Sequence, residues 1–271
     1  MCWDTASLGD NCTAWVFING AVSNAKVFNN VLTTTLSTQG YQALIYFAAG
    51  YSSASGGNQS GNAAYNNTLV GQNGTGISCE CAGILTTTQN TSTQTGFVAE
   101  NNIFVNFLSS YAAIQNNDGT LFGKYGTGID YNEYFNTDEV GYEATNNQHY
   151  YWAATTLWKV ANGTNAFPGY DVHGNIGNPL LNYFHIPQTG SAAIGAGVNL
   201  TSLGITALDS DIHGPAAGFN GTSMPPFSAR PATGAWTIGA SNTTGLSTPP
   251  PNNWIWNGPA KTETLFVRQA N

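Results

Sequence analysis

Charged residues are scarce in this sequence. They make up 7% of its 271 residues, with 6 Lys and Arg against 14 Asp and Glu, and the formal net charge is −8. Nucleic acids are bound through stripes of basic side chains, and anionic membrane surfaces attract basic segments. The charge balance therefore argues against both kinds of partner.

Long hydrophobic runs are also missing. No apolar run approaches the length of a membrane-spanning helix, and the N-terminus has neither the basic nor the apolar region of a signal peptide. The abundance of Gly, Asn, Thr and Ser is nevertheless typical of an extracellular protein. We therefore expect an extracellular or cell-surface location, with the secretion signal and some preceding sequence missing before Met1.

Cysteine is rare, with four residues in the chain. In an extracellular setting Cys2 and Cys12 could form a disulfide that fixes the first turn, and the alternative is two free thiols. Cys79 and Cys81 are only two positions apart, so a disulfide between them would be strained. We expect these two side chains to point inward as small hydrophobic groups.

Instead of amphipathic helical repeats, the chain contains a recurring Asn pair. Asn29-Asn30 returns as Asn66-Asn67, as Asn101-Asn102 and, more weakly, as Asn132-Glu133, at spacings of about 30 to 37 residues. A short apolar run follows each pair, and a second one lies between pairs. These runs are rich in β-branched and aromatic residues and are bounded by Gly, Asn and Ser, which predicts short strands in stacked repeats.

The Asn pairs have a structural interpretation in such a stack. Asn tolerates the left-handed backbone of a sharp corner, and stacked Asn side chains can hydrogen-bond from one repeat to the next as a ladder. A ligand-binding role is the alternative. The repeats therefore predict an all-β parallel β-helix with an Asn ladder at one corner.

Further motifs carry a resemblance to a known family. They are Asn-Asn-Ile at 101–103, Asp-Tyr-Asn at 130–132, Tyr-Phe-His-Ile at 183–186, Arg-Pro at 230–231 and Ile-Gly-Ala at 238–240. With the Asn pairs, this pattern resembles the right-handed parallel β-helix proteins of the pectate-lyase-like superfamily, in particular the C-terminal portion of secreted bacterial members. The resemblance implies a single-stranded right-handed solenoid over residues 1–240 with a loop-rich C-terminal cap over its last repeat. Residues 241–271 are expected to be a linker and extension.

One segment departs from the strand pattern. Between Asn146 and Ala161 the aromatic residues fall at near-helical spacing, so a short helix flanking the repeats is expected there. Trp152 in this segment is a candidate for contact with a sugar. The alternative is an aromatic stripe that belongs to the core.

In the enzymes of the resembled family, substrate lies along the outer face of one parallel sheet. Strict alternation along the strands, including one expected at 76–81, places five side chains on that face: Trp15, Phe17, Tyr46, Glu80 and Gln115. Aromatic rings there could stack on sugars, and a carboxylate could act as acid or base. The alternative is that a loop, such as the one at 50–63, packs over this face.

The richest acidic region follows the third Asn pair. Asp130 and Glu133, together with Glu80, are candidate catalytic carboxylates for glycoside hydrolysis. Asp138 and Glu139 are candidate ligands of calcium, the one cofactor that the sequence suggests. The alternatives are a structural corner at Asp130 and a solvated acidic loop.

Two classes of function remain open. One is a secreted protein that binds, and as an enzyme would cleave, a polysaccharide, with neutral glycans favoured by the scarcity of Lys and Arg. Lyase chemistry is less favoured than hydrolysis, because no Lys or Arg falls on the expected groove strands. The other class is a non-catalytic adhesin or fibre, which could self-associate through the open edge of its first repeat.

Overall fold

The structure is a computed structural model. It describes residues 14–33, 43–49, 57–71, 82–88, 92–107, 112–116, 128–137, 139–143, 148–153, 156–160, 171–182, 185–211 and 229–242. For the strands between 139 and 160 the backbone alone is described. Within these ranges the protein is all-β, apart from the single-turn 3₁₀ helices η3 (Thr201–Leu203) and η4 (Thr206–Leu208).

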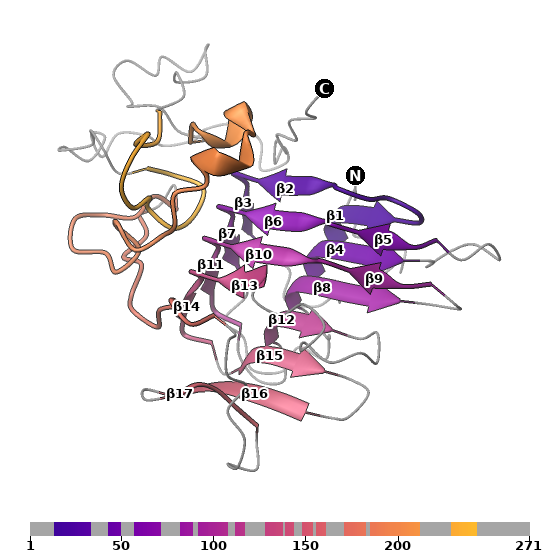
Figure 1. The fold of residues 1–271 in the computed structure, drawn as a ribbon. Coiled ribbons are helices and arrows are strands. Elements are labelled where there is room, and N and C mark those ends of the chain that lie inside the picture. The colour runs from indigo at the N-terminus through magenta and orange to yellow at the C-terminus, as the bar shows by residue number, and fades with distance from the viewer. Residues whose placement is uncertain are drawn as a thin grey trace, which may run out of the picture.

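Successive repeats contribute one strand each to three stacked sheets (Figure 1). Sheet A contains β1 (Ala14–Asn19), β4 (Ala43–Ala49), β8 (Ala82–Thr88), β12 (Ala112–Asn116), β15 (Glu139–Glu143), β16 (Gln148–Ala153) and β17 (Thr156–Val160). Sheet B contains β2 (Lys26–Phe28), β6 (Ala63–Tyr65), β10 (Val98–Glu100) and β13 (Ile129–Asp130). Sheet C contains β3 (Val31–Thr33), β7 (Thr68–Val70), β11 (Ile103–Val105) and β14 (Glu133–Phe135). A two-stranded sheet of β5 (Gln59–Ser60) and β9 (Gln94–Thr95) lies beside them.

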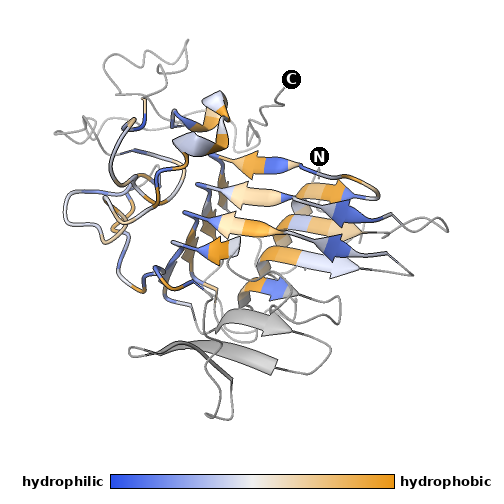
Figure 2. Cartoon of the chain, viewed as in Figure 1, coloured by the Kyte–Doolittle hydropathy of each residue, from blue (hydrophilic) through white to orange (hydrophobic). Residues whose placement is uncertain are grey.

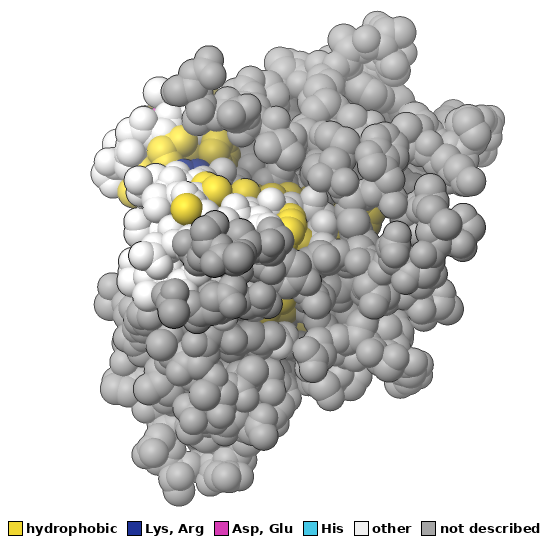
Figure 3. Space-filling model, turned by 90° about the vertical axis from the view of Figure 1, so that its right-hand side faces the viewer, with side chains coloured by type: hydrophobic (Ala, Val, Ile, Leu, Met, Phe, Trp, Pro, Cys, Tyr) yellow, Lys and Arg dark blue, Asp and Glu magenta, His cyan; other side chains and the backbone are white. Residues whose placement is uncertain are grey.

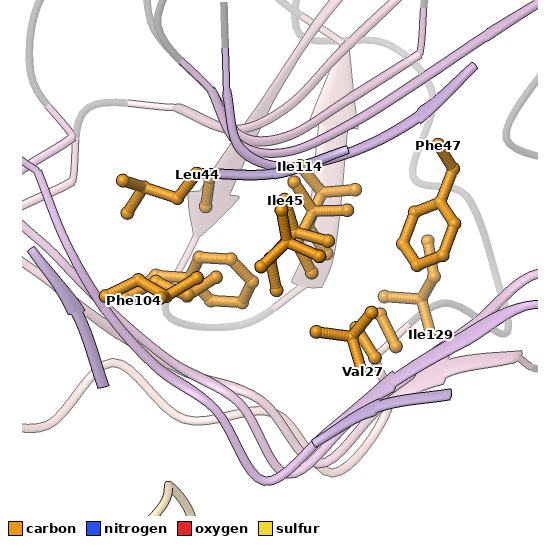
Figure 4. Close-up of a cluster of buried hydrophobic side chains, with 14 of the residues drawn as sticks. Val27, Leu44, Ile45, Phe47, Phe104, Ile114 and Ile129 are labelled. Atoms are coloured by element: carbon orange, nitrogen blue, oxygen red, sulfur yellow. The ribbon is translucent and has the colours of Figure 1, made fainter. Parts of the chain in front are cut away.

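The pairing is parallel throughout sheets B and C and across the first five strands of sheet A. Equivalent residues of successive repeats face one another: Val16 pairs with Ile45, Ile45 with Ile84, and Ile84 with Ile114. Figure 4 shows the resulting core, where side chains from the three sheets point into one interior. The prediction of parallel strands in stacked repeats is confirmed.

Asn residues form the predicted ladder inside one corner. Asn30 Nδ2 donates to Asn67 Oδ1 at 2.9 Å, Asn67 Nδ2 to Asn102 Oδ1 at 2.9 Å, and Asn102 Nδ2 to Asn132 Oδ1 at 3.0 Å. The backbone N–H of Asn30, Asn67 and Asn102 donates to the same oxygens. Because all four side chains are buried, these bonds satisfy polar groups that water does not reach.

The first Asn of each pair has a different role. Asn29, Asn66 and Asn101 adopt positive φ values of 55°, 48° and 59°, so the predicted left-handed corner is confirmed. Their side chains bond outward to the chain beyond residue 185, whose described residues 185–211 and 229–242 we name the C-terminal cover. The bonds run from Asn29 Nδ2 to the Ser210 carbonyl, from Asn101 Nδ2 to the Val198 carbonyl, and from Arg230 Nη1 to the Asn66 amide oxygen at 3.1 Å.

The C-terminal cover packs along the outer faces of sheets B and C (Figure 1). Leu200, Leu208 and Trp236 join a cluster with Phe28 and Tyr65 of sheet B. On sheet C the cover residues Ala193 and Ile238 contact Ile103 and Val105. We expected a cap over the last repeat; instead the cover lies alongside the stack, because the outer Asn row and the apolar outer faces offer it partners there.

Two features of sheet A correct the sequence analysis. The helix expected between 146 and 161 is wrong: β16 and β17 form an antiparallel extension of the sheet. Short aromatic runs fit a strand as well as a helix, and the open edge of β15 supplies backbone partners. The third parallel strand is β8 at 82–88, after the strand expected at 76–81, and 76–81 lies outside the described residues.

Side chains near the N-terminal ends of the sheet A strands do not alternate strictly between the two faces of the sheet. Leu44 and Ala113, expected to face outward, belong to the central core, and Trp15 packs against that core. The next column, from Val16 to Ile114, faces inward as well. Residues of two adjacent columns therefore point into the core. Trp15 belongs to one of these columns and so does not lie on the expected groove face.

Candidate functional site

A column of side chains on the outer face of sheet B ends in two carboxyl groups. In register, Phe28 pairs with Tyr65, Tyr65 with Glu100, and Glu100 with Asp130. Each lies directly before a residue with a left-handed backbone. The C-terminal cover packs on the aromatic half of this column, whereas Glu100 and Asp130 remain partly exposed.

Glu100 and Asp130 influence one another. Burial, with a smaller contribution from the negative charge of Asp130, raises the pKa of Glu100 to about 7. Near neutral pH a proton is therefore available on Glu100. Burial and the charge of Glu100 also raise the pKa of the neighbouring Tyr65 to about 12, so that phenol stays neutral.

Asp130 is held by donors from three sides. Its Oδ1 accepts the backbone N–H of Tyr131 at 2.9 Å and that of His173 at 2.8 Å, and its Oδ2 lies 2.9 Å from Nδ1 of His173. The His173 ring stacks on the Tyr131 ring, with centroids 4.4 Å apart and planes at 9°. The side chain of Asp130 is 18% exposed and that of His173 is 55% exposed, so this group reaches solvent.

Glu133, three residues later, is in a different environment. It lies at the start of β14 and is fully buried, and no described residue makes a hydrogen bond of normal geometry to either carboxyl oxygen. Burial raises its pKa to about 8, and a weaker influence of the Asn175 side chain acts in the opposite direction. A catalytic role for Glu133 would therefore require the C-terminal cover to move away.

Asp171 ends the Asn ladder and was not predicted. Its Oδ1 accepts the backbone N–H of Asn132 at 3.1 Å, and its Oδ2 accepts Asn132 Nδ2 at 3.3 Å and the Tyr134 hydroxyl. Burial raises its pKa to about 7, and the bonds from Tyr134 and Asn132 partly offset this shift. All the donors come from the fold itself, so Asp171 has a structural role.

Three of the predicted groove residues, Phe17, Tyr46 and Gln115, lie in one column of sheet A. Phe17 pairs with Tyr46, and Leu85 pairs with both Tyr46 and Gln115. Phe17 is 38% exposed and its ring lies 5.0 Å from that of Tyr46, but Tyr46 and Gln115 are 2% and 3% exposed. Their proposed sugar contacts stay a prediction, and the burial agrees with the covered-face alternative.

The remaining candidates are not brought together by the described chain. Glu80, Asp138 and the four cysteines, including Cys2 and Cys12, lie outside the described residues. Trp152 lies in β16 and Glu139 begins β15, where the backbone alone is described. The described residues contain no group of three or more His, Cys, Asp or Glu side chains arranged to hold a metal, so calcium stays a prediction.

The described part of the chain contains no helix long and apolar enough to cross a membrane. No protein-family model matches the chain, and neither a curated protein nor a solved structure matches it.

Glu100 and His173 are the residues that the sequence analysis missed. Glu100 occupies the same repeat position as Tyr65 and Asp130, directly before a corner, so aligning the repeats could have found it. His173 lies 43 residues after Asp130 and joins it through a segment without a repeat pattern. No local signal in the sequence predicts that contact.

Proposed function

We propose that this protein is an extracellular polysaccharide hydrolase of the parallel β-helix type, whose acid and nucleophile are Glu100 and Asp130. The single observation that carries the proposal is this partly exposed carboxyl pair, in which Glu100 retains a proton near neutral pH. A proton donor and a carboxylate acceptor side by side are the groups that glycoside hydrolysis requires.

The finer description of the fold is part of the same proposal. One strand per repeat in each of three parallel sheets, joined by an Asn ladder, supports a right-handed β-helix similar to the pectate-lyase-like superfamily. Hydrophobic strands alternate with hydrophilic corners along the chain (Figure 2), as expected when each repeat contributes one layer to a common core.

The strand register suggests how the pair would act. Adjacent strands hold paired residues about 4.8 Å apart, close to the separation of about 5 Å between the carboxyl groups of retaining glycosidases. Glu100 would protonate the glycosidic oxygen while Asp130 attacks the anomeric carbon and forms a glycosyl ester. Glu100, now ionised, would then take a proton from the water that hydrolyses this ester.

A neutral or weakly charged glycan fits this site best. The two carboxyl groups would repel an acidic sugar, and among the described residues His173 is the one basic side chain paired with them. On the face shown in Figure 3, the described surface consists mainly of backbone and side chains that are neither charged nor hydrophobic, with hydrophobic side chains and a small area of Lys or Arg between them.

The test is a panel of soluble polysaccharides incubated at pH 6 with the wild type, Glu100→Gln and Asp130→Asn. We expect water-added products from the wild type and a loss of at least about 100-fold in both variants. Glu133→Gln makes the same chemical change at a fully buried carboxyl group and should retain the activity. An unsaturated product would indicate a lyase, and binding without cleavage would overturn the enzymatic proposal.

A second candidate is a non-catalytic rod that self-associates. Within the described strands β1, β2 and β3 pair on one side only, which leaves an edge that could accept a strand from another copy. Sedimentation at increasing protein concentration would test this candidate, and a monomer throughout would count against it.

A further inference from the structure

Glu133 lies where sheet C meets the C-terminal cover. Its register partner on one side is Ile103, and on the other side Asn175 continues the sheet through a parallel bridge. Asn175 Nδ2 donates to the carbonyl of the cover residue Ala192 at 3.3 Å. Gly177 allows this close approach: a Cβ at that position would lie 2.2 Å from Cβ of Ala192 and 3.4 Å from Oε1 of Glu133.

Among the residues that the structure describes, no charge compensates Glu133 at this junction. The surrounding residues Ile103, Gly177 and Ala192 are apolar, and Asn175 contributes an uncharged amide. No described Asp, Lys, Arg or His faces its carboxyl group: Asp171 bonds to Tyr134 and Asn132 inside the corner, and Asp130 pairs with His173. An ionised carboxylate in such a site has a large desolvation cost, which opening the site to water would remove.

The cover segment over this site, residues 191–197, is attached by few bonds. The Ile238 N–H donates to the Ala193 carbonyl at 2.9 Å, the backbones of Gly197 and Trp236 bond in both directions, and the Ala192 N–H donates to the Asn178 carbonyl at 3.2 Å. The Asn175–Ala192 bond and the apolar contacts of Ala193 with Ile103 and Val105 add to this attachment. A segment held by small apolar contacts and a few hydrogen bonds can open locally without unfolding of the sheets.

We propose that Glu133 is a pH-sensitive latch: its protonated carboxyl group keeps residues 191–197 on sheet C, and its ionisation releases them. Release would bring water to Glu133 at the last repeat of sheet C, while Ile238 stays packed on Ile103 and Val105. The inference is independent of the proposed hydrolase activity, because it concerns a carboxyl group outside the Glu100–Asp130 pair.

The direction of the pH effect follows from linkage. The pKa of Glu133 is raised to about 8 when the cover is closed and returns toward its ordinary value of 4.5 when water reaches it. Opening therefore becomes more favourable as the pH rises through neutrality. His185, on the same cover, has a pKa lowered by burial and stays neutral across the alkaline range, so it does not produce this change.

Hydrogen exchange read by mass spectrometry tests the latch on the full chain. After correction for intrinsic exchange, the protection factor of peptides covering 191–197 should fall between about 10- and 100-fold from pH 6 to pH 9. Peptides covering β7 and β11 in the adjacent sheet should keep most of their protection.

Two variants give the test its control. Glu133→Gln retains the shape of the side chain without the charge, so its 191–197 protection should hardly change with pH. Glu100→Gln removes a half-buried carboxyl on sheet B and should show the same fall as the wild type. A fall in Glu133→Gln equal to that of the wild type, or no fall in the wild type, would overturn the proposal.

Discussion

Asp130 and Glu133 lie three residues apart on opposite sides of one corner, and their surroundings differ sharply. On the outer face of sheet B, Asp130 has three hydrogen-bond donors and reaches solvent beside Glu100. On the outer face of sheet C, Glu133 is fully buried and has no hydrogen bond of normal geometry to any described residue. The pKa values of Glu100 and Glu133 are both raised by burial, so a shifted pKa alone does not distinguish a candidate catalytic group from a structural one.

The C-terminal cover produces this difference. It packs over the aromatic half of the sheet B column and stops short of the carboxyl half, whereas on sheet C it reaches the last repeat. Removing its attachments should therefore make the two carboxyl sites more alike.

Of the changes that weaken the attachment of the cover, the replacement of Arg230 with Ala should have the largest effect. The buried guanidinium donates to Asn29 Oδ1 and to the carbonyls of Thr237, Gly239 and Ala240. Its loss removes these buried hydrogen bonds, so we expect a decrease of about 3 to 5 kcal/mol in the free energy of unfolding. Denaturant unfolding measures this decrease, with the exposed change Ser60→Ala as a control expected to remain within about 0.5 kcal/mol of the wild type. An Arg230→Ala variant as stable as Ser60→Ala would show that Arg230 is not the anchor of the cover.

A smaller and more local effect is expected from Gly177→Ala. The added methyl would overlap Cβ of Ala192, so the cover must shift away from Glu133 at every pH. We expect a loss of about 1 to 3 kcal/mol in unfolding free energy and faster exchange over 191–197 at pH 6. Gly204→Ala is a control without steric overlap, because an added methyl meets no atom within 4 Å there, although its φ of 69° adds a backbone strain that Gly177 does not have. Unchanged exchange in Gly177→Ala at pH 6 would contradict the close packing of this junction.

The sequence predicts the repeating part of the fold far better than the cover. The Asn pairs and their apolar neighbours occur at a fixed repeat position, so parallel strands, corners and the ladder follow from local pattern. The cover instead depends on contacts between distant residues, such as Asn29 with Arg230, which no periodicity records. Short runs of aromatic residues fit a strand as well as a helix, and for this reason the prediction of a helix at 146–161 was wrong.

The residues of the candidate site also differ in how far the sequence predicts their roles. Asp130 was identified because it is part of a motif beside a corner, and Glu133 because it is a neighbouring carboxylate. What separates them is burial under residues some 40 to 60 positions later in the chain, and that is visible only in three dimensions. Glu100 belongs to no motif of its own, and its relation to Tyr65 and Asp130 becomes visible only when the repeats are aligned in register.

The most direct test of this comparison is an NMR titration of side-chain carboxyl carbons in protein labelled at Glu, for the wild type and Gly177→Ala. In the wild type we expect the pKa to be about 7 for Glu100 and about 8 for Glu133. In Gly177→Ala the pKa of Glu133 should fall toward 4.5 while that of Glu100 stays unchanged. Ordinary values for both groups in the wild type, or equal shifts in the variant, would contradict the distinction between a sealed and an accessible carboxyl site.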